Sequence, residues 1–255
     1  MSILSLEQLS KHFRGLVAVD GLDLQLNLGE LVGLIGPNGA GKTTVFNMIT
    51  GFYPPTKGKV IFNGTDISKK TAPKVSRLGI ARTFQLTNLF GDLTVHENIM
   101  IGGETHAGMG LGLVDSFFPR ARTKSLDKKV EDLMELTGTA KLKNELAKNL
   151  PHGHQRLVEL AIALATEPKI LLLDEPVSGM IDEEATKMME LITSLRRNGK
   201  LGILLVEHNM KAVMRYCDRI CVLDFGKKIA EGSPADIQQT ESVIKAYLGQ
   251  EENAA

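Results

Sequence analysis

The sequence predicts an α/β fold around a mixed, mostly parallel sheet, because fully apolar runs alternate with helical patterns. Two such runs, Ile170–Leu173 and Ile203–Val206, are each followed at once by charged residues. Between them, Glu183–Arg197 has the spacing of a helix. A third run, Leu31–Ile35, leads straight into a glycine-rich turn at Gly36–Gly39, which is typical of a strand buried on both faces.

The N-terminal quarter predicts further strands and a short helix. Apolar and polar residues alternate over Leu22–Leu28, which indicates a strand with one solvent-facing side. Residues 43–50 have helical spacing and end before Gly51, a suitable helix C-cap. Val60–Phe62 is followed by Asn63-Gly64, which predicts a strand and a tight turn.

The middle of the chain predicts a loop between helices. Glycines punctuate Gly102–Gly112 without any periodicity, so we expect a loop insert over residues 102–125. Amphipathic helices are expected over Leu126–Leu136 and Leu157–Leu164. Residues 251–255 are expected to form a frayed tail.

Composition excludes several classes of protein. The 255 residues carry 30 Lys+Arg against 30 Asp+Glu, and 43% are apolar, which excludes a disordered chain. Zero net charge excludes a nucleic-acid binder that works through a broadly positive field. Cys217 and Cys221 are expected to be reduced core residues. No apolar run approaches the roughly 20 residues that span a bilayer, so we expect a cytosolic chain whose tie to a membrane comes through a partner.

The glycine-rich turn matches the pattern G-x-x-x-x-G-K-[ST], which binds nucleotide phosphates. Glycines let backbone N–H groups turn toward phosphate oxygens, and the following helix directs its positive N-terminus at them. Lys42 would reach the β- and γ-phosphates, and the Thr43 hydroxyl would bind Mg²⁺. The predicted ATP-binding residues of this segment are Gly36, Pro37, Asn38, Gly39, Ala40, Gly41, Lys42, Thr43 and Thr44.

The apolar run Ile170–Leu173 delivers Asp174 and Glu175 to the carboxyl edge of the sheet, where ligands collect in open α/β folds. Asp174 would hold Mg²⁺ through its waters, and Glu175 could take a proton from an attacking water. Taken alone, two acids after an apolar run can equally cap the next turn. Paired with the phosphate-binding pattern, they predict ATP hydrolysis.

With these two motifs, the chain resembles an ATP-binding-cassette (ABC) transporter ATPase from about Leu4 to Leu248. The resemblance implies a P-loop NTPase fold with an N-terminal antiparallel β lobe and a helical subdomain. It also implies one ABC ATPase domain over residues 1–255. Its nucleotide-binding core would be residues 1–85 and 165–250, and residues from about 86 to 164 would hold the Q-loop and the helical subdomain.

The resemblance implies roles for three more residues. Gln85 resembles the Q-loop glutamine, which contacts Mg²⁺ and touches the transmembrane partner. His208 resembles the switch histidine that senses the γ-phosphate, and Phe13 resembles the aromatic that stacks on adenine. Without the family order, each would be ordinary: a solvated glutamine, a surface or core histidine, and a packed phenylalanine.

Two family motifs depart from their usual form. In place of Leu-Ser-Gly-Gly-Gln, the signature loop that acts on the facing subunit's ATP reads Leu150, Pro151, His152, Gly153 and His154, followed by Gln155. Because Pro151 has neither a hydroxyl nor an N–H, two phosphate contacts are lost, while Gly153 keeps its N–H near the helix start. In the D-loop, Ile181 cannot hydrogen-bond across a dimer, and Asp182 is expected to be the N-cap of helix 183–197.

The context of Gln85, the insert 102–125 and the C-terminal ending resemble the ATPase subunit of bacterial branched-chain amino acid importers. The implied cofactors are ATP and Mg²⁺. The implied partners are transmembrane permease subunits, a second ABC ATPase subunit and, indirectly, a periplasmic binding protein; no nucleic acid is expected. The implied location is peripheral, on the cytoplasmic face of the inner membrane. Importers of urea or organic acids, a lipopolysaccharide exporter and a soluble assembly ATPase remain alternatives.

Overall fold

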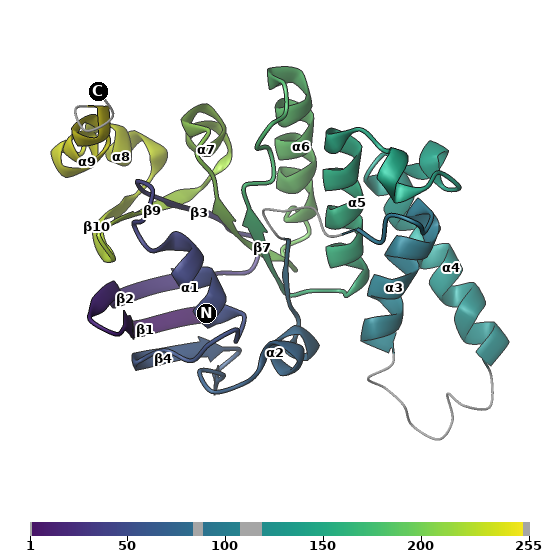
Figure 1. Cartoon of the computed structure of the whole chain (residues 1–255), viewed down its shortest axis with the longest axis horizontal. Coiled ribbons are helices and arrows are strands. Elements are labelled where there is room, and N and C mark those ends of the chain that lie inside the picture. The colour runs from purple at the N-terminus through teal and green to yellow at the C-terminus, as the bar shows by residue number, and fades with distance from the viewer. Residues whose placement is uncertain (1, 84–88, 108–118, 252–255) are drawn as a thin grey trace.

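The structure is a computed structural model that describes residues 2–83, 89–107 and 119–251. Its larger sheet lies at the centre of the molecule (Figure 1). Five neighbouring strands are parallel and the edge strand β10 is antiparallel. The predicted α/β class with a mixed, mostly parallel sheet is therefore confirmed. The strands lie in the order β10 (Lys227–Gly232), β9 (Arg219–Asp224), β3 (Leu31–Ile35), β8 (Gly202–Val206), β7 (Ile170–Asp174) and β6 (Ile80–Arg82).

A second, antiparallel sheet forms the predicted N-terminal lobe. Its strand order is β2 (Leu16–Leu26), β1 (Leu4–Phe13), β4 (Lys57–Phe62) and β5 (Thr65–Asp66). The predicted turn at Asn63-Gly64 joins β4 to β5, and both residues have positive φ, 47° and 73°. Phe13 is the last residue of β1.

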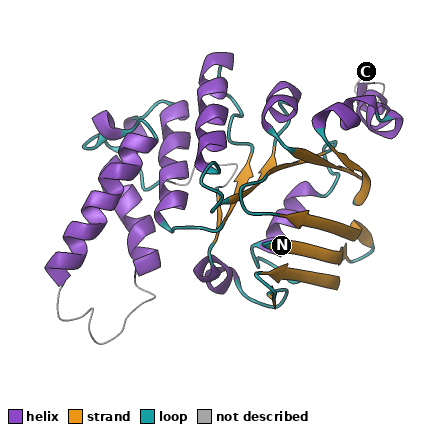
Figure 2. Ribbon diagram, turned by 180° about the vertical axis from the view of Figure 1, so that it is seen from behind, coloured by secondary structure: helices purple, strands orange, loops and turns teal. Residues whose placement is uncertain are grey.

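Helices cover the large sheet, and a group of them lies beyond one end of it. Figures 1 and 2 show α3, α4 and α5 grouped at the end of the molecule that lies away from β1, β2 and β4. Two single 3₁₀ turns, Ala140–Leu142 and Ala147–Asn149, connect α4 to α5. The helices are α1 (Lys42–Ile49), α2 (Ala72–Leu78), α3 (Val95–Ala107), α4 (Pro119–Leu136), α5 (His152–Ala165), α6 (Asp182–Leu195), α7 (Met210–Tyr216), α8 (Pro234–Gln239) and α9 (Glu241–Glu251).

The parallel strands are buried on both faces, as their unbroken apolar runs predict. In β3, Val32 and Leu34 pack into the core shared with the antiparallel sheet and α1. Leu31 and Ile35 pack into the core on the other face, with α6 and α7. Because β3, β7 and β8 are parallel neighbours, their carboxyl ends meet at one edge of the sheet.

The expected loop insert was wrong at both ends. Gly102 and Gly103 lie inside α3, and residues 119–125 belong to α4; residues 108–118 lie outside the described residues. The glycine at 102 serves packing, since a Cβ there would lie 2.7 Å from the carbonyl oxygen of Ile162 on α5. The glycine therefore permits close helix–helix contact rather than a turn.

The expected cap of α6 was also wrong. The N-cap is Ile181, without a side-chain hydrogen bond, and Asp182 is the first helical residue. Asp182 stands with Glu183 and Glu184 in the first turn, where negative charge is favourable beside the helix N-terminus. The helix ends at Leu195, two residues earlier than expected.

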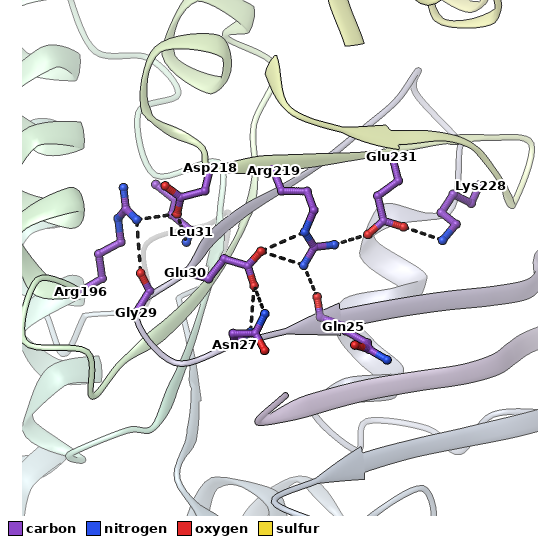
Figure 3. Close-up of polar contacts among 10 residues, drawn as sticks. All are labelled: Gln25, Asn27, Gly29, Glu30, Leu31, Arg196, Asp218, Arg219, Lys228 and Glu231. Carbon is purple, nitrogen blue, oxygen red and sulfur yellow. Dashed lines mark hydrogen bonds and ion pairs between the residues drawn. The ribbon is translucent and has the colours of Figure 1, made fainter. Parts of the chain in front are cut away.

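Charged side chains form a network at the amino ends of β3 and β9, shown in Figure 3. Arg219 pairs with Glu30 at 2.8 Å and with Glu231, and it donates to the carbonyl of Gln25. This network, here called the amino-edge network, joins the antiparallel lobe to the large sheet and α6. Its further members are Arg196, which pairs with Asp218 at 2.5 Å, Lys228, which pairs with Glu231 at 2.5 Å, and Asn27, which donates to Glu30.

Candidate active site

The phosphate-binding pattern forms a compact loop between the end of β3 and the start of α1. Gly36, Gly39 and Gly41 have positive φ values of 151°, 79° and 104°. A Cβ on Gly36 would lie 2.1 Å from the carbonyl oxygen of Leu223, so only glycine fits there. The predicted strand–turn–helix context is therefore present, with the helix N-terminus directed at the loop.

Lys42 lies across the inside of this loop. Its Nζ donates to the carbonyl oxygens of Gly36, at 2.6 Å, and Pro37, at 2.9 Å. Burial lowers the pKa of Lys42, while the nearby carboxylates of Glu175 and Asp174 raise it in opposition. A buried ammonium inside a glycine-rich loop at a helix N-terminus, with two carboxylates close enough to influence it, is the arrangement expected for holding a polyphosphate and its metal ion.

Glu175 and His208 come together from the ends of neighbouring strands β7 and β8. His208 Nε2 lies 3.0 Å from Glu175 Oε1. The backbone N–H of Glu175 donates to the carbonyl of Val206, and φ at Glu175 is 52°, an unusual value for a long side chain. Strained backbone of this kind collects at functional sites, and here it directs the carboxylate toward the phosphate loop.

These groups line one cavity of about 430 Å³, a size common for small-molecule sites. Its walls include Lys42, Thr43, Glu175 and His208, together with Phe13. The structure therefore brings the predicted catalytic and base-stacking residues together with the predicted phosphate-binding residues from Asn38 to Thr44, whereas Gly36 and Pro37 do not line the cavity. Gln85 lies outside the described residues.

Asp174 is buried at the end of β7 and is held by an arginine. Arg82, the last residue of β6, donates from Nη2 to Asp174 Oδ2 at 2.7 Å and from Nη1 to Asn47 Oδ1 at 2.6 Å. Among the described residues, no protein donor contacts Asp174 Oδ1. Oδ1 therefore keeps its acceptor capacity while Arg82 fixes Oδ2, although Asp174 is only 4% exposed and does not line the cavity.

The signature-loop residues do not line this cavity. Pro151 is the N-cap of α5, and His152, Gly153, His154 and Gln155 form its first turn. Gln155 donates from Nε2 to the carbonyl of Leu150 at 3.0 Å, which fastens the turn. Within a single chain, this loop is separate from the phosphate loop.

Sequence reasoning missed the role of Glu207, which follows β8. Its carboxylate is buried and accepts hydrogen bonds from the backbone N–H groups of Val177, His208 and Asn209. It therefore ties the segment after Glu175 to the segment that carries His208. Burial raises the pKa of Glu207, against the lowering effect of those three hydrogen bonds. An acid directly after the apolar run Ile203–Val206 was the available signal.

Comparison with known proteins decides the family. Residues 19–178, more than half of the chain, match the family model described as ABC transporter. The chain belongs to the ABC transporter family. Residues 227–253 match a second model, described as branched-chain amino acid ATP-binding cassette transporter. The family's ATPase domain shows that the chain binds and hydrolyses ATP.

Individual relatives of the ABC family are similar over the full length. The chain is 42% identical to the Escherichia coli high-affinity branched-chain amino acid transport ATP-binding protein LivG, covering 97% of this chain and 98% of LivG. It is 36% identical to the lipopolysaccharide export system ATP-binding protein LptB of Haemophilus influenzae, covering 98% and 99%. A solved ATP-binding cassette in its ADP conformation superimposes with a TM-score of 0.85 at 32% identity, covering 98% of this chain and 99% of that one.

Proposed function

We propose that the chain is the ATPase subunit that powers an importer of branched-chain or related amino acids. The observation that carries this proposal is the similarity to LivG over nearly the whole chain. The match of residues 227–253 to a branched-chain amino acid model supports it, because this segment lies outside the general ABC match. Export of lipopolysaccharide is the second candidate. Its support is the 36% identity to LptB, which is lower than the 42% identity to LivG.

Within the cavity, each residue has a role in phosphoryl transfer, which depends mostly on positioning and on neutralising charge. Lys42 binds the β- and γ-phosphates while the loop amides and the start of α1 surround them. Glu175 accepts a proton from the attacking water. His208 holds the Glu175 carboxylate by the 3.0 Å contact and presents its exposed side toward the γ-phosphate. Phe13 stacks on the base.

The residues present fit a magnesium ion. The Thr43 side chain is exposed in the cavity, and Asp174 keeps one carboxylate oxygen without a protein donor. Hydroxyl, carboxylate and phosphate oxygens are the ligands that Mg²⁺ prefers, and the described residues contain no cluster of three His, Cys, Asp or Glu side chains that would suit another metal. Thr43, Asp174 and Gln85 would hold the ion, which neutralises phosphate charge when bound.

A second ATPase subunit is proposed to face the signature loop of residues 150–155. Two features weaken the phosphate site that this loop offers in trans. Pro151 provides no N–H, and the Glu184 carboxylate lies 3.4 Å from the position of a Cβ on Gly153. Pro151→Ser should therefore raise the ATPase rate of the assembled transporter, and an unchanged rate would contradict this role.

The permease is proposed to dock in an apolar groove between the large sheet and the helical group. The groove is lined from α2, β6 and α5, and its lining includes Thr83, which precedes Gln85 by two positions in the sequence. The exposed ring of Phe52 lies in it, as does Arg82, which holds Asp174. A permease segment seated there would contact Arg82, whose partner Asp174 precedes the cavity residue Glu175. Peripheral membrane association follows from such docking; among the described helices, none is long and apolar enough to cross a bilayer.

Co-purification from detergent-solubilised membranes tests the transport role. The tagged chain should recover two permeases, and Phe52→Glu should lose them while still binding ATP. Leu28→Glu is the matched control and should retain them, because Leu28 is also an exposed apolar residue, 43% against 56% for Phe52, and lies outside the groove. Recovery of the wild-type chain without any permease would contradict the transport role.

Substrate uptake separates the two candidates. Vesicles containing the recovered complex should accumulate labelled leucine in an ATP-dependent manner, and Glu175→Gln should abolish the accumulation. ATP-dependent release of lipopolysaccharide without leucine uptake would favour the exporter instead.

A further inference from the structure

Phe225 occupies an unusual position at the tip of the β9–β10 hairpin. Its side chain is 86% exposed, although it is large and apolar. Phe225 has φ of 43° and Gly226 has φ of 80°, so both central residues of the turn are left-handed. Such a turn favours Asn, Asp or Gly at its first position, and an aromatic residue there is strained. An exposed ring held in a strained turn is a candidate for contact with a ligand.

The hairpin tip is fixed between the phosphate loop and the antiparallel lobe. The N–H of Gly226 donates to the carbonyl of Ala40 in the phosphate loop at 3.0 Å. The carbonyl of Gly226 accepts from the N–H of Asp20 in β2 at 2.9 Å. A Cβ on Gly226 would lie 2.8 Å from the carbonyl oxygen of Ala18, so the approach to β2 is close. Phe225 is therefore presented at a set place beside the nucleotide cavity.

Phe225 lines the same cavity as Lys42, and its neighbours in the cavity wall are apolar. Phe13, Leu16 and Val17, from the adjoining β1–β2 hairpin, are also exposed there. Phe13 pairs with Leu16 across that hairpin, and its ring is braced edge-on by Tyr53 at 5.4 Å. Two hairpins thus place exposed apolar side chains around one part of a cavity whose remainder binds phosphate.

We propose that Phe225 is a second aromatic contact for the nucleotide and packs against its base or ribose. A nucleotide base is flat and stacks favourably on aromatic rings. A bound base would also cover apolar side-chain surface that is otherwise exposed to water. The proposal rests on the assignment of this cavity as the nucleotide site. It adds a nucleotide-contacting residue that lies two positions before the segment 227–253 matched by the branched-chain amino acid model.

A tryptophan reporter tests this contact directly. The chain contains no tryptophan, so Phe225→Trp places a single indole at the hairpin tip. Its emission should change on titration with ATP or ADP and should stay constant with tripolyphosphate, which lacks base and ribose. Phe90→Trp is the matched control, since Phe90 is exposed but does not line the cavity, and its emission should stay constant with all three. Constant emission from Phe225→Trp at saturating ATP would overturn the proposal.

Affinity measurements with the purified full chain give the second readout. Phe225→Ala should weaken ATP binding about fivefold to tenfold, the scale of one aromatic contact, while tripolyphosphate binds as to wild type. Phe225→Tyr should restore ATP affinity. Equal ATP affinity in Phe225→Ala, or an equal loss for tripolyphosphate, would overturn the contact with base or ribose. Normal ATP binding by Lys42→Ala would instead overturn the assignment of the cavity, so the two failures are distinguishable.

Discussion

Charged side chains gather at both edges of the parallel sheet, and the two edges differ in how those charges are satisfied. At the amino edge, Arg219 is balanced by Glu30 and Glu231, and Arg196 by Asp218 (Figure 3). At the carboxyl edge, Arg82 is paired with Asp174 in the same way. Lys42 differs: among the described residues it donates to loop carbonyls alone, although two carboxylates lie near enough to influence its pKa.

The charged residues at the two edges also differ in backbone geometry. Both edges contain left-handed glycines, such as Gly39 in the phosphate loop and Gly29 at the amino edge, but at the carboxyl edge the charged residue Glu175 is itself left-handed. At the amino edge, Glu30 and Arg219 have ordinary negative φ values, since neither is among the described residues with positive φ. Charges paired with one another stabilise a fold, whereas charges held by strained backbone around a cavity are arranged for a ligand. The comparison predicts that equivalent substitutions at the two edges have opposite kinds of effect.

The largest effect is expected for Lys42→Ala. ATP affinity should fall about a hundredfold or more, because charge-assisted hydrogen bonds to phosphate are lost. Hydrolysis should be undetectable. The free energy of unfolding should not decrease, because the ammonium is buried without a direct carboxylate partner. Calorimetric titration with ATP and urea denaturation measure the two quantities, and a destabilised chain that still binds ATP would break the comparison.

An intermediate effect is expected for Arg219→Gln at the amino edge. The free energy of unfolding should fall by about 1–3 kcal/mol, because two partly buried carboxylates lose their shared partner. ATP turnover per folded molecule should remain at the wild-type value. Urea denaturation gives the first quantity and steady-state hydrolysis in the assembled complex gives the second. Wild-type stability with reduced turnover would assign the network to catalysis.

The smallest effect is expected from Glu207, whose folded-state pKa is raised by burial. A carboxyl group with a raised folded-state pKa binds its proton more readily in the folded chain. The free energy of unfolding should therefore fall as pH rises from the unfolded value near 4.5 through the folded pKa. Glu207→Gln should flatten this part of the profile. An equally steep profile in the variant would show that another group causes the dependence.

The sequence predicted the parts of the site that depend on contiguous spacing. The phosphate loop and the acids after Ile170–Leu173 each directly follow a buried strand. Predicting that strand from the sequence is therefore enough to place each of them. Arg82 could not be predicted as the partner of Asp174, because their contact joins residues 92 positions apart through the pairing of β6 with β7. Phe225 could not be predicted as a cavity residue for a related reason. Its position beside the cavity depends on the docking of the β9–β10 hairpin against the phosphate loop.

Errors in the elements arose where tertiary contact overrode a local signal. Glycines at 102 and 103 indicated a loop, yet they lie in α3 where it packs closely on α5. Asp182 is of a residue type that commonly caps helices, but it lies in the first turn of α6, where its negative charge stabilises the helix N-terminus. In both cases the residue type marks a special position in the structure, but the role predicted from it, a loop or a cap, differs from the observed one.

The same substitution at both edges tests the central claim most directly. Glu175→Gln and Glu30→Gln should be compared for ATP hydrolysis in the assembled complex and for the free energy of unfolding of the isolated chain. We expect Glu175→Gln to bind ATP, to lose hydrolysis by about a hundredfold or more and to retain stability. Glu30→Gln should hydrolyse ATP normally and lose about 1–2 kcal/mol of stability. Undiminished hydrolysis in Glu175→Gln, or loss of hydrolysis in a stable Glu30→Gln, would contradict the assignment of the carboxyl edge as the hydrolytic edge.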